Sequence, residues 1–399
     1  METNKPNNMI PFQEALETVK YATKKLDSER IDLADCLNRV LAQDVLSDMS
    51  IPPFNKSAMD GYACKNADLD ENLEVLEIIA AGSCATKKIG DHQCSKIMTG
   101  AKVPEGADTV IMIEHTERID DKHIRFTKQK TKSNICLKGE DIQENDLVLK
   151  KGTRLKAQHI SVLASVGCSN PLVYKQPKVA ILATGSELVE PNQKPNTSQI
   201  RNVNSWQIQA QIQKTGIKCN NKGIVSDSKE TTKKAMTECL EKNDVLIMSG
   251  GVSVGDYDFV PQILKELGFN IWFHTLLVKP GKHTVFAACK GKYVLGLPGN
   301  PVSSFVQFEL LGKPLLYRLM GHDYHAPMVR MPIASDYKRK KSERLEFIPV
   351  RFNADNQVVP IHYHGSAHIN AFTAANGIML VPTDVDEFME GEFVHVRQL

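Results

Sequence analysis

Between Lys178 and Met320, short apolar runs alternate with segments whose apolar residues recur at helical spacing. This alternation predicts a mainly parallel β-sheet with helices on both faces, a doubly wound αβα domain. The predicted strands are Val179–Ala183, Gly223–Val225 with some preceding residues, Val245–Met248, Ile271–Val278 and Tyr293–Leu297. The predicted helices are Trp206–Lys214, Glu230–Lys242, Phe259–Leu267 and Val302–Met320, and we expect Trp206, Trp272, Phe305 and Phe308 to lie in the core.

The flanking sequence has a different pattern. Phe12, Leu16 and Val19 recur at helical spacing after Pro11, and Gln158–Val166 predicts a second short helix. Between them, short β-like runs with glycine and charged turns predict a small β domain. From about Pro327 the chain is strand-like again, which predicts a C-terminal β-barrel or sandwich. These strand-like runs are Val75–Ala80, Thr109–Glu114, His123–Thr127, Arg344–Phe352, Gln357–His362, Ile378–Pro382 and Glu392–Val396.

Unusual polar segments follow the five predicted strands of the central domain. In an open parallel sheet the ligand crevice lies at the carboxyl ends of the strands, so we expect these segments to converge on one rim. A single polar, glycine-rich loop is common for turn reasons alone, but five on one edge indicate a binding site. They read TGSE at 184–187, SDS at 226–228, SGGVSVGDYD at 249–258, KPGK at 279–282 and GLPGNP at 296–301.

The segment SGGVSVGDYD is the most informative of the five. Its glycines allow sharp turns that present backbone N–H groups to an anion. Asp256 and Asp258 would repel an anion unless a cation lies between them, and Mg²⁺ is the simplest choice. The loop therefore predicts a site for phosphate and metal, with Ser249, Gly250, Gly251, Ser253 and Gly255 in contact with the substrate.

Bulk properties exclude several other classes. A length of 399 residues predicts two to four domains. The formal net charge of +2 gives no single-sign field for nucleic acid, and the run 338–341 (KRKK) fits a solvated turn. No apolar run approaches the roughly 18 residues that span a bilayer. Nine scattered cysteines without a C-x-x-C motif, and an N-terminus unlike a signal peptide, predict a reduced cytoplasmic protein.

Long motifs in both halves of the chain resemble one family. They are IPPFNKSAMDGYA at 51–63, IMTGAKVPEGADTVIMIE at 97–114, NICLKGEDI at 134–142, ATGSEL at 183–188, SGGVSVGDYD, KPGK and GLPGNPVSSFVQFE at 296–309. Together they are similar to the MoeA-type molybdopterin molybdenumtransferases and to the insertase half of gephyrin. The resemblance covers nearly the whole chain in the family's order.

The resemblance implies an elongated subunit of four domains. Residues 1–50 with 143–176 would form a discontinuous N-terminal domain, and 51–142 an inserted β-rich domain. Residues 177–326 would form the αβα molybdopterin-binding domain, and 327–399 a C-terminal β-barrel. It also implies a two-fold homodimer in which the αβα domain of one subunit and the inserted domain of the other share each active site.

The resemblance also implies a reaction. Such an enzyme ligates molybdate into adenylylated molybdopterin and releases AMP with Mg²⁺ as cofactor. Molybdopterin adenylyltransferase and molybdoenzyme acceptors would be further partners. By residue-by-residue matching, the catalytic residues fall on Asp60, Glu187, Asp227 and Asp258, and the last three would hold the metal. Substrate-binding residues fall on Thr99, Asp141, Lys279, Lys282, Pro298, Gly299 and Pro301.

Several of these residues have a structural alternative. Asp60 before Gly61 could start a turn, and Thr99 could end a strand. Asp227 could cap the helix that starts near Lys229, and Glu187 could cap a loop. Lys282 could be a surface lysine. Asp258 is the least easily explained structurally, because Asp256 is available to serve the turn.

Two departures from the family pattern stand out. Cys136 stands where the family commonly has arginine, whose planar fork suits phosphate, although Lys138 could substitute. Ser186 stands where the family often has aspartate. Separately, His362, His364 and His368 have metal-ligand spacing, although the family is not known for a zinc site there.

Two other classes of function compete with the insertase. The related adenylyltransferases share only the αβα domain and carry a different glycine loop, so they leave residues 1–170 and the C-terminal domain unexplained. A non-catalytic scaffold, the other role of gephyrin, would not need nearly all of the site residues. Both molybdate and tungstate remain open as the natural oxyanion.

Overall fold

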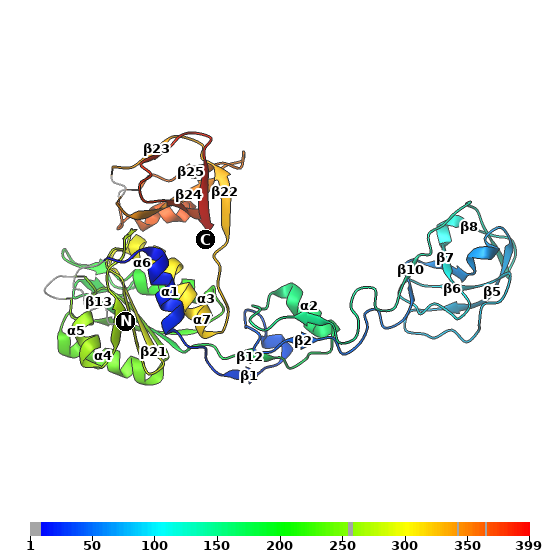
Figure 1. The fold of residues 1–399 in the computed structure, drawn as a ribbon, viewed down its shortest axis with the longest axis horizontal. Helices are drawn as coiled ribbons and strands as arrows, with labels where there is room; N and C mark the ends of the chain where they lie inside the picture. The colour runs from blue at the N-terminus through cyan, green and yellow to red at the C-terminus, as the bar shows by residue number, and fades with distance from the viewer. Residues whose placement is uncertain (1–8, 254–257, 341–342, 364) are drawn as a thin grey trace. The chain divides into compact units, whose positions relative to one another are not determined.

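The computed structural model describes residues 9–253, 258–340, 343–363 and 365–399, which fall into two compact units. Unit 1 comprises Met1–Ala42, Gly152–Lys156 and Pro171–Leu399. Unit 2 comprises Gln43–Lys151 and Ala157–Asn170. Figure 1 shows the elements of both units, and each is described here by itself.

Unit 1 is organised around a six-stranded sheet with the order β16-β13-β17-β21-β20-β18. The first four strands are parallel, and β20 and β18 continue the sheet in antiparallel pairing. Continuous apolar runs such as Val245–Met248 form the inner strands, because both faces of the sheet are covered. The strands are β13 (Val179–Thr184), β16 (Cys219–Val225), β17 (Val245–Ser249), β18 (Asn270–Phe273), β20 (Val285–Cys289) and β21 (Lys292–Leu297).

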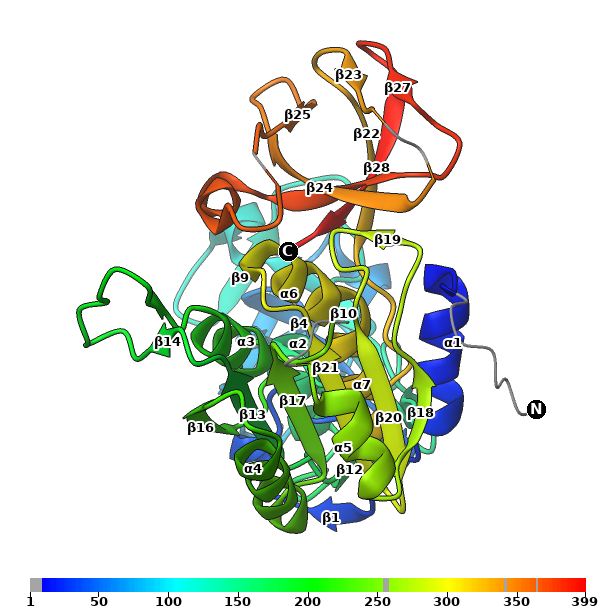
Figure 2. The same ribbon diagram turned by 90° about the vertical axis from the view of Figure 1, so that its left-hand side faces the viewer.

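Alternate residues of the central strands enter two separate cores. Ile181 and Ile247 pack with helices on one face, and Leu182 and Met248 pack with helices on the other. Figure 2 shows α4 and α5 in front of the strands. The first face carries α1 (Phe12–Ala22), α3 (Asn204–Gln213), α6 (Pro301–Gln307) and α7 (Lys313–Leu319), and the second carries α4 (Lys229–Lys242) and α5 (Val260–Glu266).

Three predictions about these elements were wrong. The segment Ile271–Val278 is not one strand, because β18 ends at Phe273 and β19 (Val278–Lys279) leaves the sheet to pair with β24. The predicted helix Val302–Met320 is interrupted by the π-helical turn Phe308–Gly312. Trp206 and Trp272 are 49% and 36% exposed rather than core residues. The strand β20 was not predicted.

A second sheet in unit 1 has the order β19-β24-β26-β28-β22, with β25 paired to β24. An isolated bridge joins Ile333, just after β22, to Val358 in β25. Arg339 from the predicted solvated turn is buried instead, and its guanidinium donates to the carbonyls of Val385 and Arg344. The strands are β22 (Met328–Pro332), β24 (Leu345–Phe352), β25 (Val358–Pro360), β26 (Gly377–Val381) and β28 (Phe393–Gln398), with β23 (Tyr337–Lys338) paired to β27 (Glu387–Phe388).

Two small strand pairs and two 3₁₀ turns complete unit 1. The pair β14 and β15 lies in the chain between β13 and α3. The bounds are β1 (Ser28–Arg30) with β12 (Leu172–Tyr174), β14 (Leu188–Val189) with β15 (Ile200–Arg201), and the turns Leu33–Asp35 and Ile369–Ala374.

Unit 2 contains a six-stranded sheet with the order β7-β4-β6-β5-β9-β8, as the β-like runs of this region predict. Its core includes Cys64, Leu73 and Ile111. The strands are β4 (Gly61–Cys64), β5 (Asn72–Ile79), β6 (Gln93–Ile97), β7 (Thr109–Met112), β8 (Thr116–Arg118) and β9 (His123–Phe126). Unit 2 also contains two short strand pairs, β3 (Lys56–Ser57) with β10 (Ile135–Cys136) and β2 (Val45–Leu46) with β11 (Leu147–Leu149). Its helix is α2 (Ala157–Ser165), and its two 3₁₀ turns are Asn66–Asp68 and Ile113–His115.

Three general observations complete the fold. The part of the chain that the structure describes contains no helix long and apolar enough to cross a membrane. The nine cysteines are free thiols. The boundaries of the four domains expected from the sequence stay a prediction, because the two compact units divide the chain at other residues.

Candidate functional site

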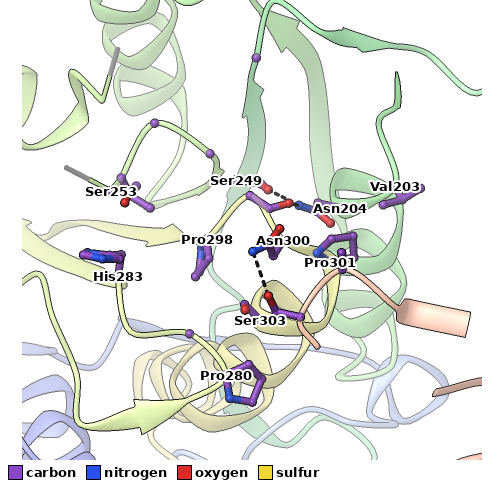
Figure 3. A pocket seen from close by; sticks show the side chains of 18 of the residues that line it. Val203, Asn204, Ser249, Ser253, Pro280, His283, Pro298, Asn300, Pro301 and Ser303 are labelled. Carbon is purple, nitrogen blue, oxygen red and sulfur yellow. Dashed lines mark hydrogen bonds between the residues drawn. The ribbon is translucent and has the colours of Figure 1, made fainter. Parts of the chain in front are cut away.

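A pocket of about 880 Å³ lies in unit 1 where the loops after β13, β17 and β21 meet. The registers of these strands align Ala183 with Ser249 and Ser249 with Leu297, so the loops start at one level. All five predicted polar segments contribute to the wall, including KPGK, although β19 lies outside the central sheet. The predicted convergence on one rim is therefore observed, as Figure 3 shows for several labelled side chains.

The start of the glycine loop has a backbone that only glycine accommodates easily. Gly250 and Gly251 have φ angles of 89° and 69°, in the left-handed region. A Cβ on Gly250 would lie 2.6 Å from the carbonyl oxygen of Thr184, and one on Gly251 would lie 2.9 Å from the Thr184 hydroxyl oxygen. The two glycines thus let the β17 loop pass directly over the end of β13.

Asn204 ties two of these loops together from the first residue of α3. Its Nδ2 donates to the hydroxyl of Ser249 at 2.7 Å and to the carbonyl of Gly299 at 2.6 Å. The bond to Ser249 is visible in Figure 3. Because Asn204 is 6% exposed, these bonds hold the β17 and β21 loops in a fixed relationship at the base of the pocket.

The three predicted metal-binding acids all line this pocket. Glu187 follows β13, Asp227 follows β16, and Asp258 follows the glycine loop. The backbone N–H of Ser186 donates to Asp227 at 2.8 Å, and the backbone N–H of Asp227 donates to the Ser186 hydroxyl at 3.1 Å. Ser186, a departure from the family pattern, therefore joins the loop that carries Glu187 to the loop that carries Asp227.

The alternative role of Asp227 as a helix cap is wrong. The N-cap of α4 is Ser228, whose side chain accepts from the backbone N–H of Thr231. Asp227 lies one residue earlier and directs its carboxylate to the backbone of Ser186. Its other carboxylate oxygen accepts no hydrogen bond from the residues that the structure describes, so it is available to a ligand in the pocket.

The two predicted lysines have different surroundings. Lys279 is 46% exposed, and its Nζ lies 2.7 Å from Oε1 of Glu346, a residue of β24. Lys282 is exposed at the pocket wall. One lysine is thus held by a buried carboxylate, and the other is left to solvent.

Twelve of the predicted site residues line the pocket together, and three others lie elsewhere in the described chain. Gly255 lies outside the described residues, as does Asp256. Asp60, Thr99 and Asp141 belong to unit 2. The twelve are Glu187, Asp227, Ser249, Gly250, Gly251, Ser253, Asp258, Lys279, Lys282, Pro298, Gly299 and Pro301.

Asp60 and Thr99 form a hydrogen-bonded pair in unit 2. The backbone N–H and the hydroxyl of Thr99 donate to Oδ1 of Asp60 at 2.6 and 2.8 Å. These two bonds, the backbone bond foremost, hold the pKa of Asp60 below its usual value. Asp141 is exposed, and its backbone N–H donates to the carbonyl of Ile51.

Cys136 ends β10 opposite Lys56, in the same unit. Burial, followed by the neighbouring Glu140 carboxylate, raises the pKa of the Cys136 thiol. The thiol therefore stays protonated at neutral pH and offers no positive charge where the family commonly has arginine. The backbone N–H of Lys138 donates to the Asn55 side chain at 2.8 Å.

The structure adds pocket residues that the sequence reasoning missed. His283 follows Lys282, and its Nδ1 is buried without a hydrogen-bond partner among the described residues. Burial, with the positive charge of Lys282 next, lowers the pKa of His283, so this imidazole is neutral at pH 7. Other lining residues come from segments that no motif singled out: Arg201, Arg344, Tyr363 and Ser366.

A ready-made metal centre is not part of the described chain. No group of three His, Cys, Asp or Glu side chains there is arranged to hold a metal ion unaided. Of the histidines with metal-ligand spacing, His364 lies outside the described residues. His362 and His368 both have interactions with other residues.

Comparison with known proteins identifies the family. Residues 10–167 match the MoeA N-terminal region (domain I and II), 180–318 match a probable molybdopterin binding domain, and 332–399 match the MoeA C-terminal region (domain IV). The chain is 34% identical over 403 residues to the molybdopterin molybdenumtransferase of Staphylococcus aureus, covering 98% of this chain and 95% of that one. The corresponding Staphylococcus epidermidis enzyme is 33% identical, covering 97% and 95%.

A solved structure agrees with this comparison. The molybdopterin biosynthesis MoeA protein of Pyrococcus horikoshii OT3 is 29% identical, with a TM-score of 0.82 over 98% of this chain and 100% of that one. The fold is accordingly a MoeA-like one, with several domains of mixed α/β content. The chain belongs to the MoeA-type molybdopterin molybdenumtransferase family, whose members are transferases of molybdenum cofactor biosynthesis.

Proposed function

We propose that the unit 1 pocket ligates molybdate into adenylylated molybdopterin and releases AMP in a Mg²⁺-dependent reaction. One observation carries this proposal: three carboxylates and two lysines from four separate segments of the chain line a single pocket of about 880 Å³. A substrate with a diphosphate link needs both features. Lysines and backbone N–H groups bind phosphoryl oxygens, and carboxylates bind the cation that neutralises them.

The pocket residues fit Mg²⁺ by their chemistry. Glu187, Asp227 and Asp258 supply hard carboxylate oxygens, which Mg²⁺ prefers. Mg²⁺ usually takes one or two carboxylates and completes its shell with water and substrate phosphates. Binding of Mg²⁺ therefore does not require three protein carboxylates grouped around one point, and the described residues contain no such group. When bound, the ion would neutralise charge on the phosphoryl oxygens.

The chain's own residues would bind and orient the substrate. The N–H group of Gly251, at the loop that passes over β13, suits a phosphate, whereas that of Gly250 donates to the Leu297 carbonyl at 3.1 Å and fixes the loop. Lys279 and Lys282 suit molybdate, which is an oxyanion. Neutral His283 can accept or donate one hydrogen bond through its unpaired Nδ1 without adding charge.

The second half of the predicted site belongs to unit 2. Asp60, Thr99 and Asp141 would complete the cleft of a two-fold homodimer, in which one subunit supplies unit 2 and the other supplies the pocket. Exposed Asp60 and Asp141 are suited to such a contact. Their resemblance to the family's functional acids supports this arrangement.

Several finer features accompany the proposal. The central sheet would be the doubly wound αβα domain of residues 177–326, and the sheet joined by the Ile333–Val358 bridge would close as a C-terminal β-barrel. The enzyme would act in the cytoplasm, receive its substrate from molybdopterin adenylyltransferase and deliver cofactor to molybdoenzyme acceptors. Nucleic acid and membranes are not expected partners.

A reconstituted assay tests the function. Purified protein is mixed with adenylylated molybdopterin, molybdate and Mg²⁺, and AMP release and active cofactor are followed together. We expect both products, and we expect AMP release to stop when Mg²⁺ is chelated. Cofactor formation without AMP, or AMP release that is unchanged after chelation, would contradict the proposal.

A further inference from the structure

The buried carboxylate of Glu346 is linked to the pocket by an ion pair with one lining residue, Lys279. Glu346 is 3% exposed, and its Oε1 lies 2.7 Å from the ammonium nitrogen of Lys279, which lines the pocket wall. The second cation near Glu346 is Arg339, whose Nη1 lies 3.5 Å from Oε2. Oε2 has no hydrogen bond to any described residue. Lys279 is therefore the closest cation to this buried charge.

The backbone fixes this pair. Strands β19 and β24 are parallel partners, and their register aligns Val278 with Leu345 and Lys279 with Glu346. The N–H of Leu345 donates to the carbonyl of Leu277 at 3.0 Å, and the Arg344 guanidinium donates to the carbonyl of Val278 at 3.3 Å. The ion pair thus lies at a strand junction rather than at the end of two mobile side chains.

Arg339 does not replace Lys279 as partner. Its guanidinium also donates to the carbonyls of Val385, Arg344 and Pro382. Those three bonds hold Arg339 to the backbone of the loops before β24 and after β26. The ammonium of Lys279, by contrast, has three N–H donors and is half-exposed, so it can satisfy Glu346 and still present donors to the pocket.

We infer that Glu346 is a positioning residue, which holds the Lys279 ammonium at one point of the wall so that its remaining N–H groups meet the incoming oxyanion. This inference rests on the proposed function of the pocket. Glu346 does not itself contact the substrate. Its charge lowers the net positive charge near the pocket, which by itself would weaken anion binding, so its benefit must come from geometry.

The sign of one binding change tests the inference. Glu346→Gln keeps the size of the side chain and removes its charge. Coulomb's law alone predicts tighter molybdate binding, because one negative charge is lost. Positioning predicts weaker binding, by about tenfold, because Lys279 loses its fixed partner. Molybdate binding is measured by titration calorimetry, which needs no turnover. Equal or tighter binding would overturn the inference.

Three further variants separate positioning from a structural role. Glu346→Asp keeps the charge but shortens the side chain, and it should also weaken molybdate binding. Adding Glu346→Gln to Lys279→Met should cause no further loss of molybdate affinity, since Glu346 acts through Lys279. Glu387→Gln, which breaks the exposed pair with Lys338 between β23 and β27, should leave molybdate binding unchanged. A further loss in the double variant would refute the inference.

The assay distinguishes this inference from the proposed function. If wild-type protein releases AMP but Glu346→Gln binds molybdate normally, the positioning role falls and the function stands. If wild-type protein binds molybdate without releasing AMP, the function falls, and the Glu346 variants still decide the positioning role. Wild-type protein that binds no molybdate would refute both. Thermal unfolding of each variant confirms that the binding measurements are made on folded protein.

Discussion

Thr99 donates twice to one oxygen of Asp60, through its backbone N–H at 2.6 Å and its hydroxyl at 2.8 Å. Both bonds favour the ionised carboxylate and lower its pKa. The pair therefore keeps an exposed aspartate negatively charged at the residue that the family resemblance identifies as catalytic. It also gives threonine a role beside aspartate in that motif, in addition to the substrate contact that the resemblance implies for Thr99.

Thr99→Val tests this relationship. Valine keeps the backbone N–H and removes the hydroxyl, so the pKa of Asp60 should rise partway toward its usual value. Because the pKa of Asp60 is lowered in the folded protein, its carboxylate is ionised at neutral pH and becomes protonated only as pH falls through that lowered pKa. Carboxyl ¹³C titration of Asp60 measures the change, and Thr99→Ser is the control. An identical pKa in Thr99→Val would show that the hydroxyl has no role.

Asp258→Ala should nearly abolish cofactor formation, by about 100-fold or more, if Asp258 holds the cation or orients substrate. The protein should stay folded with equal or higher stability, because Asp258 shares its pocket with Glu187 and Asp227 and the three charges repel. Turnover and thermal unfolding are measured side by side. Glu241→Ala, at an exposed position of α4, is the control. Wild-type turnover by Asp258→Ala would remove Asp258 from the catalytic set.

Cys136→Arg should bind adenylylated molybdopterin as tightly as wild type or up to about tenfold tighter, because arginine adds a charge-assisted donor for phosphate. The neighbouring Glu140 carboxylate can orient the new guanidinium. Equilibrium titration with the adenylylated substrate measures this affinity. Cys84→Arg, at an exposed cysteine of the same unit, is the control. A large loss of affinity would show that the β10 loop is built around a different contact.

His322 should make unit 1 less stable in mild acid. Its Nδ1 hydrogen-bonds the Gly152 carbonyl at 2.9 Å, and its ring packs edge-on against Tyr317. Burial lowers the pKa of His322. Between that lowered pKa and the usual 6.5, the unfolded chain binds more protons than the folded protein does, so the stability of the folded protein falls as pH drops below 6.5 toward the lowered pKa.

Urea unfolding of wild type and His322→Gln across that pH range tests this expectation. The variant should lose less stability on acidification than wild type does. His325→Gln, at an exposed position nearby, should behave like wild type. Parallel pH profiles for wild type and His322→Gln would show that His322 does not contribute.

The sequence predicts most of the central sheet because its strands are continuous apolar runs buried on both faces, as in β13 and β17. The prediction from sequence fails where a strand pairs with a segment that is distant in the chain. The run Ile271–Val278 is mostly apolar, but Val278 and Lys279 pair with β24 from the C-terminal sheet, so the segment divides. Trp206 and Trp272 likewise follow the helix and strand patterns yet remain partly exposed.

In the candidate site, too, local sequence predicts some features and long-range contacts decide others. Loops after buried strands are predictable, because parallel strands direct them to one edge, and ten of the twelve predicted residues line the pocket for that reason. The other two, Lys279 and Lys282, belong to the KPGK segment at β19, outside the central sheet. Glu346 and His283 were missed because their significance lies in contacts and burial. No spacing indicates that a glutamate in a C-terminal strand lies 2.7 Å from the lysine of KPGK. Ser228 rather than Asp227 caps α4, which sequence alone could not decide.

The central claim is that AMP release requires the unit 1 pocket of one subunit and Asp60 of another. Subunits that carry Asp60→Ala are denatured, mixed and refolded with subunits that carry Asp258→Ala, and differentially tagged mixed dimers are isolated. Each parent homodimer should be inactive. In the mixed dimer one cleft collects both lesions and the other collects neither, so AMP release should return to about half of the wild-type rate per dimer. Mixed dimers that form but release no AMP would contradict the shared site.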